Sequence, residues 1–150
     1  MTQNNNDVFI CSYGRTAIGA FQGSLSKVPA TELGASVIKH LLLETAIDQN
    51  NVNELIMGNV LSANLGQAPA RQAALHAGLS NNVECLTINK VCGSGLKSIM
   101  LAQQSIMLNP ENIIIAGGME NMSQAPYYLD KSREGMMFGH SKVIDSILKD

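Results

Sequence analysis

The sequence has little charge, no excess of positive charge and no long apolar run. Charged residues make up 15% of its 150 residues, and the formal net charge is −2. Without a basic excess, the chain has no electrostatic footprint for nucleic acid. No apolar run approaches the roughly 18 residues that a membrane-spanning helix requires. Residues 1–7 lack the positive start and apolar core of a signal peptide. We therefore expect neither nucleic acid nor a membrane as a partner.

Cysteine and histidine are also scarce, and their positions exclude two kinds of site. The three cysteines, Cys11, Cys85 and Cys92, form an odd set without the spacing of metal ligands, and no cluster of histidines accompanies them. Neither a disulfide framework nor a metal site is therefore indicated. Unpaired cysteines are typical of reducing compartments, so we expect a reduced, cytoplasmic protein without a bound metal.

What the sequence does contain is a regular alternation of strand-like and helix-like segments. Hydrophobic residues make up 45% of the chain, which suits strands buried on both faces of a sheet. Strands are predicted at residues 7–12, 54–60, 84–88 and 112–116, and helices at 31–46, 69–78 and 96–108. Thr31 is expected to cap the first helix, and Pro69 and Gly78 mark the two ends of the second. This βαβαβαβ order predicts an α/β fold with a parallel sheet and right-handed crossovers.

The pattern changes after residue 118. Residues 119–139 have no clear period, whereas residues 141–149 place apolar side chains on one side of a predicted helix. We therefore divide the chain into an α/β domain at residues 1–118 and a second segment at residues 119–150. The last helix ends without a glycine or a proline, and this leads us to expect that the chain is part of a longer protein.

Residues 84–98 are typical of a buried strand, a sharp turn that holds Cys92, and the start of a helix. Backbone N–H groups and the helix dipole at such a position stabilise a thiolate by roughly 0.3–1 kcal/mol, which makes the cysteine a better nucleophile. Gly93 and Gly95 lack a Cβ, so a ligand or another segment is able to approach the backbone there. On these residues alone, the alternative stays open that Cys92 is a small buried hydrophobic residue.

Two other interpretations of the turn at Gly93, Ser94 and Gly95 fail. The nucleophile elbow of hydrolases requires a glycine two residues before the serine, and Cys92 occupies this position. The phosphate loops of nucleotide-binding proteins require a Gly-x-Gly-x-x-Gly or Gly-Lys-Ser/Thr pattern, which this turn does not have. The choice that remains is between a reactive and a buried cysteine.

Five segments of the chain carry a resemblance to a known family. They are residues 15–19 (Arg-Thr-Ala-Ile-Gly), 57–61 (Met-Gly-Asn-Val-Leu), 66–72 (Gly-Gln-Ala-Pro-Ala-Arg-Gln), 89–98 (Asn-Lys-Val-Cys-Gly-Ser-Gly-Leu-Lys-Ser) and 116–123 (Ala-Gly-Gly-Met-Glu-Asn-Met-Ser). In this order and spacing they resemble the N-terminal part of the thiolases, specifically the acetyl-CoA acetyltransferase branch. One departure is Ala17, where the family usually has proline, and it affects the stiffness of the loop rather than the chemistry.

The resemblance implies a fold, a reaction and a nucleophile. The fold is one half of a five-layered αβαβα structure, with an inserted loop domain that starts after residue 118. Cys92 is implied to be the catalytic nucleophile that carries the acetyl group as a thioester, with its backbone N–H in an oxyanion hole. The reaction is the condensation of two acetyl-CoA molecules to acetoacetyl-CoA and CoA, or the reverse thiolysis. Coenzyme A thioesters are the substrates, no separate cofactor is implied, and a homodimer or homotetramer is expected.

The resemblance also implies that part of the machinery lies elsewhere. The family's activating histidine, second cysteine and second oxyanion-hole asparagine follow the region matched here, as does most of its CoA-binding loop domain. None of His40, His76 and His140 lies in a matching motif, so this chain on its own is expected to be nearly inactive. Two alternatives are a 3-ketoacyl-CoA thiolase of broader chain length and a non-catalytic remnant that pairs with a separate C-terminal half. A redox-sensor role is disfavoured, because the spacing suggests no resolving cysteine.

Overall fold

The computed structural model describes residues 7–150. The expectation that residues 1–7 do not form a signal peptide therefore falls almost entirely outside the described residues. In chain order the elements are α1 (Ala30–Thr45), β1 (Glu54–Gly58), α2 (Pro69–Ala77), β2 (Glu84–Ile88), α3 (Ser94–Leu108), β3 (Ile114–Gly118), β4 (Tyr127–Leu129), β5 (Val143–Asp145) and α4 (Ser146–Lys149). Single turns of 3-10 helix lie at Gln49–Asn51, Met122–Gln124 and Ser132–Glu134. None of the helices between residues 7 and 150 combines the length and the hydrophobicity that spanning a bilayer requires.

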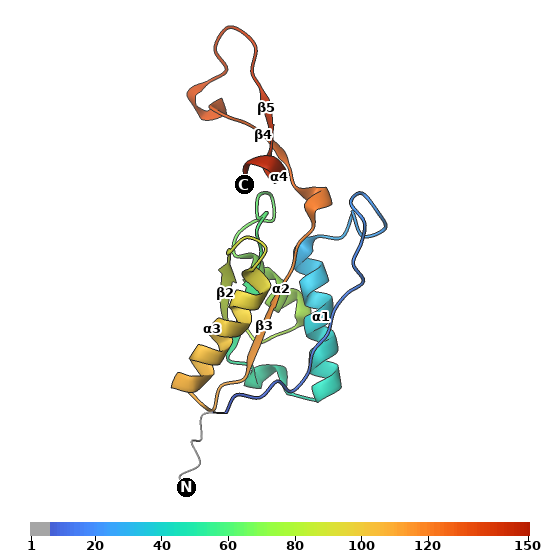
Figure 1. Cartoon of the computed structure of the whole chain (residues 1–150), viewed down its shortest axis with the longest axis vertical. Coiled ribbons are helices and arrows are strands. Elements are labelled where there is room, and N and C mark those ends of the chain that lie inside the picture. Colours follow the sequence, from blue (N-terminus) through green and yellow to red (C-terminus); the bar gives the residue numbers. More distant parts are fainter. Residues whose placement is uncertain (1–6) are drawn as a thin grey trace.

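The first three strands form a parallel sheet in the order β2-β1-β3. Helix α2 connects β1 to β2, and α3 connects β2 to β3, so the two connections cross the sheet in opposite directions. Right-handed crossovers therefore place α2 and α3 on opposite faces, and α1 packs beside α2 (Figure 1). Gly58 of β1 is paired with Ile88 of β2 and Gly118 of β3. The carboxyl ends of all three strands thus lie level at one edge.

The α/β class and three of the four predicted strands of this sheet are confirmed, but the strand predicted at residues 7–12 is wrong. That segment is extended without belonging to a sheet, and Phe9 and Ile10 are 78% and 79% exposed. An extended segment becomes a strand only when a neighbour takes up its backbone hydrogen bonds. Nothing among residues 13–150 does so, and the sheet has three strands rather than four.

Two predicted helix signals had different outcomes. Gly78 ends α2 as expected: it adopts the left-handed conformation with φ of 88°, and its N–H donates to Leu75 O at 3.0 Å. Thr31 does not cap α1, because the helix begins one residue earlier at Ala30. Thr31 is instead 3% exposed within the first turn, and Pro29 occupies the N-cap position without a side-chain hydrogen bond.

The hydrophobic core lies between the sheet and the α1–α2 layer. Fully buried apolar residues come from the sheet and from both helices, including Ile38, Leu55, Ala70, Ala73 and Val83. Strand β2 was expected to be buried, yet Leu86 is 43% exposed. The neighbouring Cys85 packs against the α1–α2 core, so Leu86 lies on the opposite face, where α3 packs mainly on β1 and β3 rather than on β2.

Helix α3 packs on the sheet through small residues rather than large ones. Its buried residues are Ser94, Ser98 and Ala102, four positions apart. The apolar residues whose spacing predicted the helix lie largely outside this contact: Leu96, Ile99, Met100 and Met107 are 67%, 46%, 47% and 48% exposed. The helix prediction is confirmed, but the large apolar residues do not form its buried face within this chain. Small residues allow a close approach of helix and sheet.

Residues 119–150 leave the α/β part and form a separate antiparallel pair, β4 with β5, followed by the short α4 (Figure 1). The helix predicted at residues 141–149 is therefore shorter than expected. Val143 and Ile144 pair with β4 instead, and the Asp145 side chain caps α4 by accepting from Ile147 N–H at 2.9 Å. The domain boundary at residue 118 stays a prediction. Met119 itself belongs to the core and is 6% exposed.

Candidate active site

Cys92 lies in the connection between β2 and α3. Gly93 is the N-cap residue of α3 and Ser94 its first residue, so Cys92 directly precedes the cap. The side chain is exposed and the thiol is free. The structure thus places Cys92 at the leading end of the helix, as predicted. Within residues 7–150 the Cys92 thiol is therefore not packed in a hydrophobic core.

The loop that presents Cys92 is held by three local hydrogen bonds that involve side chains. Ser94 Oγ accepts from Lys90 N–H at 2.8 Å and donates to Val91 O at 2.6 Å, and Asn89 Oδ1 accepts from Val91 N–H at 2.9 Å. Ser94 is 4% exposed. These bonds connect the residues on both sides of the cysteine, so the loop is shaped before any ligand binds.

Val91, the residue before the cysteine, has a strained backbone. Its φ is 49°, in the left-handed region. A β-branched residue rarely adopts this conformation, and a non-glycine residue there costs of order 1–3 kcal/mol. Such strain persists only where surrounding contacts impose it, and it concentrates at functional sites. The serine and asparagine bonds described above supply these contacts.

Glycines allow the first turn of α3 to rest on the strand ends. A Cβ on Gly58 would lie 2.7 Å from both the carbonyl carbon and the Cβ of Ser94, closer than real Cβ contacts. A Cβ on Gly118 would lie 3.4 Å from Gly95 Cα. On the next turn, Ser98 is fully buried, and its Oγ lies within hydrogen-bonding distance of two carbonyl oxygens, Gly95 O at 2.6 Å and Gly117 O at 2.8 Å. The helix start, and with it Cys92, is therefore positioned by β1 and β3.

Two polar residues for which the sequence predicted no role join the strand ends. Asn59 Nδ2 donates to Met119 O at 3.1 Å and to Glu120 Oε1 at 2.9 Å. The Glu120 carboxylate also accepts from Val60 N–H at 2.8 Å and from Leu61 N–H at 3.2 Å. We call Asn59 and Glu120 the strand-end clamp. The available signal was a polar residue one position after β1 and another two positions after β3, at the edge where parallel sheets bind ligands.

A further asparagine fastens the loop that precedes α1. Asn121 Nδ2 lies within hydrogen-bonding distance of three backbone oxygens, those of Leu25, Ser26 and Val28, at 3.1, 3.2 and 2.7 Å. Its Oδ1 accepts from Ser123 N–H at 2.9 Å. Residues nearly a hundred positions apart in the chain are thereby joined beside the same edge of the sheet.

The remaining cysteines and histidines do not gather around Cys92 into a recognisable metal site. Cys85 is half-buried in β2, and burial raises the pKa of its thiol, with Arg71 acting weakly in the opposite direction. Cys11 is exposed in the extended N-terminal segment. His40 lies 3.7 Å from Glu44 one turn further along the surface of α1. Within residues 7–150, no three His, Cys, Asp or Glu side chains are placed to hold a metal ion.

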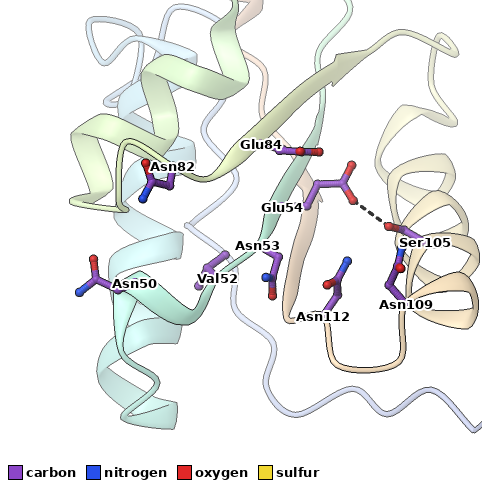
Figure 2. Close-up of a pocket in the computed structure, with 9 residues that line it drawn as sticks. All are labelled: Asn50, Val52, Asn53, Glu54, Asn82, Glu84, Ser105, Asn109 and Asn112. Atoms are coloured by element: carbon purple, nitrogen blue, oxygen red, sulfur yellow. Dashed lines mark hydrogen bonds between the residues drawn. The ribbon is translucent and has the colours of Figure 1, made fainter.

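A hollow of the described surface lies at the opposite edge of the sheet. This cavity of about 410 Å³ is lined by Asn50, Val52, Asn53, Glu54, Asn82, Glu84, Ser105, Asn109 and Asn112. Figure 2 shows Glu54 and Glu84 at the amino ends of β1 and β2, with Ser105 Oγ donating to Glu54 Oε2 at 3.0 Å. The lining contains no thiol, imidazole or amine. The cavity therefore lacks a cysteine nucleophile and is distinct from the Cys92 site.

Known proteins match the chain in sequence and in structure. The thiolase N-terminal domain family matches residues 8–150. Acetyl-CoA acetyltransferase 2 of Arabidopsis thaliana is 53% identical over 147 residues, which are 98% of this chain and 36% of that protein. Acetyl-CoA acetyltransferase of Cupriavidus necator is 54% identical over 144 residues, or 96% of this chain and 37% of that protein. The crystal structure of the Acat5 thiolase from Ascaris suum in complex with coenzyme A has a TM-score of 0.83 and 37% identity, covering 89% of this chain and 34% of that one.

These matches cover the elements that build the site. The family match includes β1, the Cys92 loop, α3 and the Met119–Ser123 segment. The structural match supports the expected thiolase-like half. The chain spans about a third of the length of the curated relatives it matches. On this sequence and structural evidence, the chain belongs to the thiolase family and carries its N-terminal domain.

Proposed function

We propose that this chain provides the nucleophilic cysteine of an acetyl-CoA acetyltransferase, and that Cys92 is this nucleophile. The observation that carries the proposal is the exposed Cys92 thiol directly before the N-cap of α3, on a strained loop at the carboxyl edge of a parallel sheet. Helix N-termini stabilise negative charge, and this edge is where parallel sheets bind their ligands. Relatives that are 53% and 54% identical are named acetyl-CoA acetyltransferases, which indicates the acyl group.

In the proposed reaction, the Cys92 thiolate attacks the thioester carbonyl of acetyl-CoA. A new sulfur–carbon bond forms, the bond to CoA breaks, and CoA leaves as a thiolate that takes up a proton. The enolate of a second acetyl-CoA, formed by loss of an α-proton, then attacks the acetyl-Cys92 carbonyl. This step releases acetoacetyl-CoA and regenerates the Cys92 thiolate. We expect the backbone N–H of Cys92 to donate a hydrogen bond to the developing oxyanion. Such donors contribute a large part of the transition-state stabilisation in acyl transfer.

The complete reaction requires groups beyond those that this chain supplies. The α-proton needs a base, and no histidine or second cysteine is placed for this role among the residues described. Because the chain spans about a third of its curated relatives, we assign the full activity to a protein in which the remaining region is present. Coenzyme A thioesters are the substrates in this proposal, without a separate cofactor. We further propose a cytoplasmic location and a homodimeric or homotetrameric assembly.

The proposal is tested by substitution of Cys92 in the protein as its natural host makes it. Acetoacetyl-CoA formation and thiolysis are measured for the native protein, for Cys92→Ser and for Cys11→Ser. Loss of a nucleophile typically lowers the rate by several orders of magnitude, so Cys92→Ser should be inactive. Cys11→Ser is the matched control, since Cys11 is also an exposed thiol, and it should keep its activity. Full activity of Cys92→Ser would overturn the proposal.

A further inference from the structure

Asn59 lies where the carboxyl ends of all three parallel strands meet. It directly follows the last residue of β1, and its backbone N–H donates to Ile88 O of β2 at 3.0 Å. Its side chain reaches past β3 to Met119 O and Glu120, as described above. Asn59 is 2% exposed. One buried side chain with its backbone therefore connects the three strand ends.

The hydrogen-bonding pattern fixes how the Asn59 amide is oriented. A flipped amide would place its oxygen against two other oxygens, Met119 O and Glu120 Oε1. In the observed orientation Oδ1 is buried and has no partner within residues 7–150. Buried polar atoms without a partner are rare in native proteins. The two donor bonds thus hold the side chain in place while its acceptor stays unpaired, and one of them is strengthened by the charge of Glu120.

The clamp acts on the residues that support the first turn of α3. Gly58 directly precedes Asn59, Gly118 lies two positions before Glu120, and the two glycines are paired in register. Ser94 packs on Gly58 and Gly95 on Gly118, with no room for a Cβ at Gly58. A shift of one strand end relative to the other therefore displaces the helix start.

Displacement of the helix start is transmitted to Cys92 by Ser94. This serine holds the backbone of Lys90 and Val91 through its hydroxyl, and Cys92 lies between these residues and the helix. We infer that Asn59 and Glu120 are positioning residues for Cys92, because their hydrogen bonds fix the strand ends on which the Cys92 loop is built. The catalytic part of this inference rests on the proposed function, whereas its geometric part does not.

Three variants of the native protein test the inference. Asn59→Asp replaces both donor bonds with repulsion between oxygens, and Glu120→Gln keeps the size of the side chain but loses part of its acceptor capacity. The double variant Asn59→Asp/Glu120→Gln restores one bond in reverse, because the amide introduced at position 120 then donates to the carboxylate introduced at position 59. Asn121→Asp is the matched control, because it also replaces an asparagine amide by a carboxylate. The hydrogen bonds that it breaks are to the carbonyl oxygens of Leu25, Ser26 and Val28, which do not belong to the strand-end clamp.

Two readouts separate positioning from stability and from the proposed function. The first is the rate at which iodoacetamide alkylates Cys92, with Cys11 of the same molecule as the internal reference. The second is the rate of acetyl transfer from acetyl-CoA to Cys92, together with KM. We expect alkylation to slow about two- to fivefold in each single variant, as the thiolate loses its alignment with the helix N-terminus. Acetyl transfer should slow about tenfold or more, with KM changed by less than about twofold.

The outcomes distinguish the two claims. The positioning role is supported if alkylation and acetyl transfer are slower in both single variants and recover in part in the double variant. The rates of Asn121→Asp should equal those of the native protein. If Asn59→Asp does not fold, Glu120→Gln is sufficient for the same comparison, because it preserves the shape of the side chain. The inference is overturned if the folded single variants alkylate and react at the native rate, or if Asn121→Asp slows them equally. If the native protein takes up no acetyl group, the proposed function fails, and the alkylation rates still decide the positioning role.

Discussion

Gly58 and Ser94 are packed so closely that the carbonyl carbon of Ser94 would lie 2.7 Å from a Cβ on Gly58. Gly58 ends β1, and Ser94 begins the helix that follows Cys92. A strand end and a helix start that are 36 positions apart in the sequence are thus in direct van der Waals contact. The position of Cys92 depends on this contact, because Ser94 also holds the backbone of the Cys92 loop.

Gly58→Ala should destabilise the protein, because the added methyl group meets the backbone of α3, which cannot move aside as a flexible side chain can. Overpacking of this kind costs about 1–3 kcal/mol. Gly117→Ala is the matched control, since a Cβ there lies 3.6 Å from Met57 Sδ, an ordinary contact. Urea unfolding of both variants measures the difference. Equal stability of the two variants would contradict the close packing of α3 on β1.

Ser98→Ala should lower the free energy of unfolding by about 1 kcal/mol, because the buried hydroxyl lies within hydrogen-bonding distance of Gly117 O in β3 as well as of Gly95 O in its own helix. The control is Ser36→Ala in α1. Its hydroxyl is exposed and donates only to Leu33 O, three residues earlier in the same helix. The difference between the two denaturation curves isolates the bond from α3 to β3. If Ser36→Ala lowered the free energy of unfolding as much as Ser98→Ala does, the bond from α3 to β3 would contribute nothing to stability.

The thiol of Cys85 should react slowly at neutral pH in the folded protein. Burial raises its pKa, so less of it is present as the reactive thiolate. Its iodoacetamide rate, followed by mass spectrometry, should rise when urea removes the burial. The same shift implies that the folded state loses stability as the pH rises from the unfolded-state pKa through the higher folded-state pKa. A rate at Cys85 that is equal with and without urea would argue against the burial.

Asn121→Ala should loosen the loop before α1 without affecting the Cys92 loop. The substitution removes the donor that lies near three carbonyl oxygens at residues 25–28, and hydrogen bonds of this type contribute about 0.5–1.5 kcal/mol each. Hydrogen exchange should become faster at residues 19–28 and stay unchanged at residues 89–93. Faster exchange in both segments would show that the two loops open together.

Sequence signals were sufficient at Gly78 and at the turn before α3, where structure is decided locally, although the local signal at Thr31 failed. The glycine at position 78 stopped α2 because it adopts a left-handed backbone conformation at no steric cost. The turn between β2 and α3 was recognisable from an apolar run, two glycines and the helical spacing that follows. The location of Cys92 ahead of a helix was therefore predictable without any tertiary information.

Features that depend on distant partners were not predictable. Residues 7–12 have the composition of a strand but find no neighbour to pair with, and residues 143–145 pair with β4 rather than extend a helix. Asn59 and Glu120 meet only because β1 and β3, about 60 positions apart, are adjacent in the sheet. The buried face of α3 could also not be predicted from hydrophobic spacing, because serine and alanine, rather than the large apolar residues, make its contact with the sheet.

The most direct test of Cys92 as the nucleophile is to find which residue of the native protein becomes acetylated. The native protein is mixed with acetyl-CoA labelled in its acetyl group, quenched in acid to preserve the thioester, digested and analysed by mass spectrometry. We predict one labelled peptide, which contains Cys92, and removal of the label when CoA is added before quenching. Label on Cys11 or Cys85, or no label on any cysteine while acetoacetyl-CoA is being formed, would contradict this prediction.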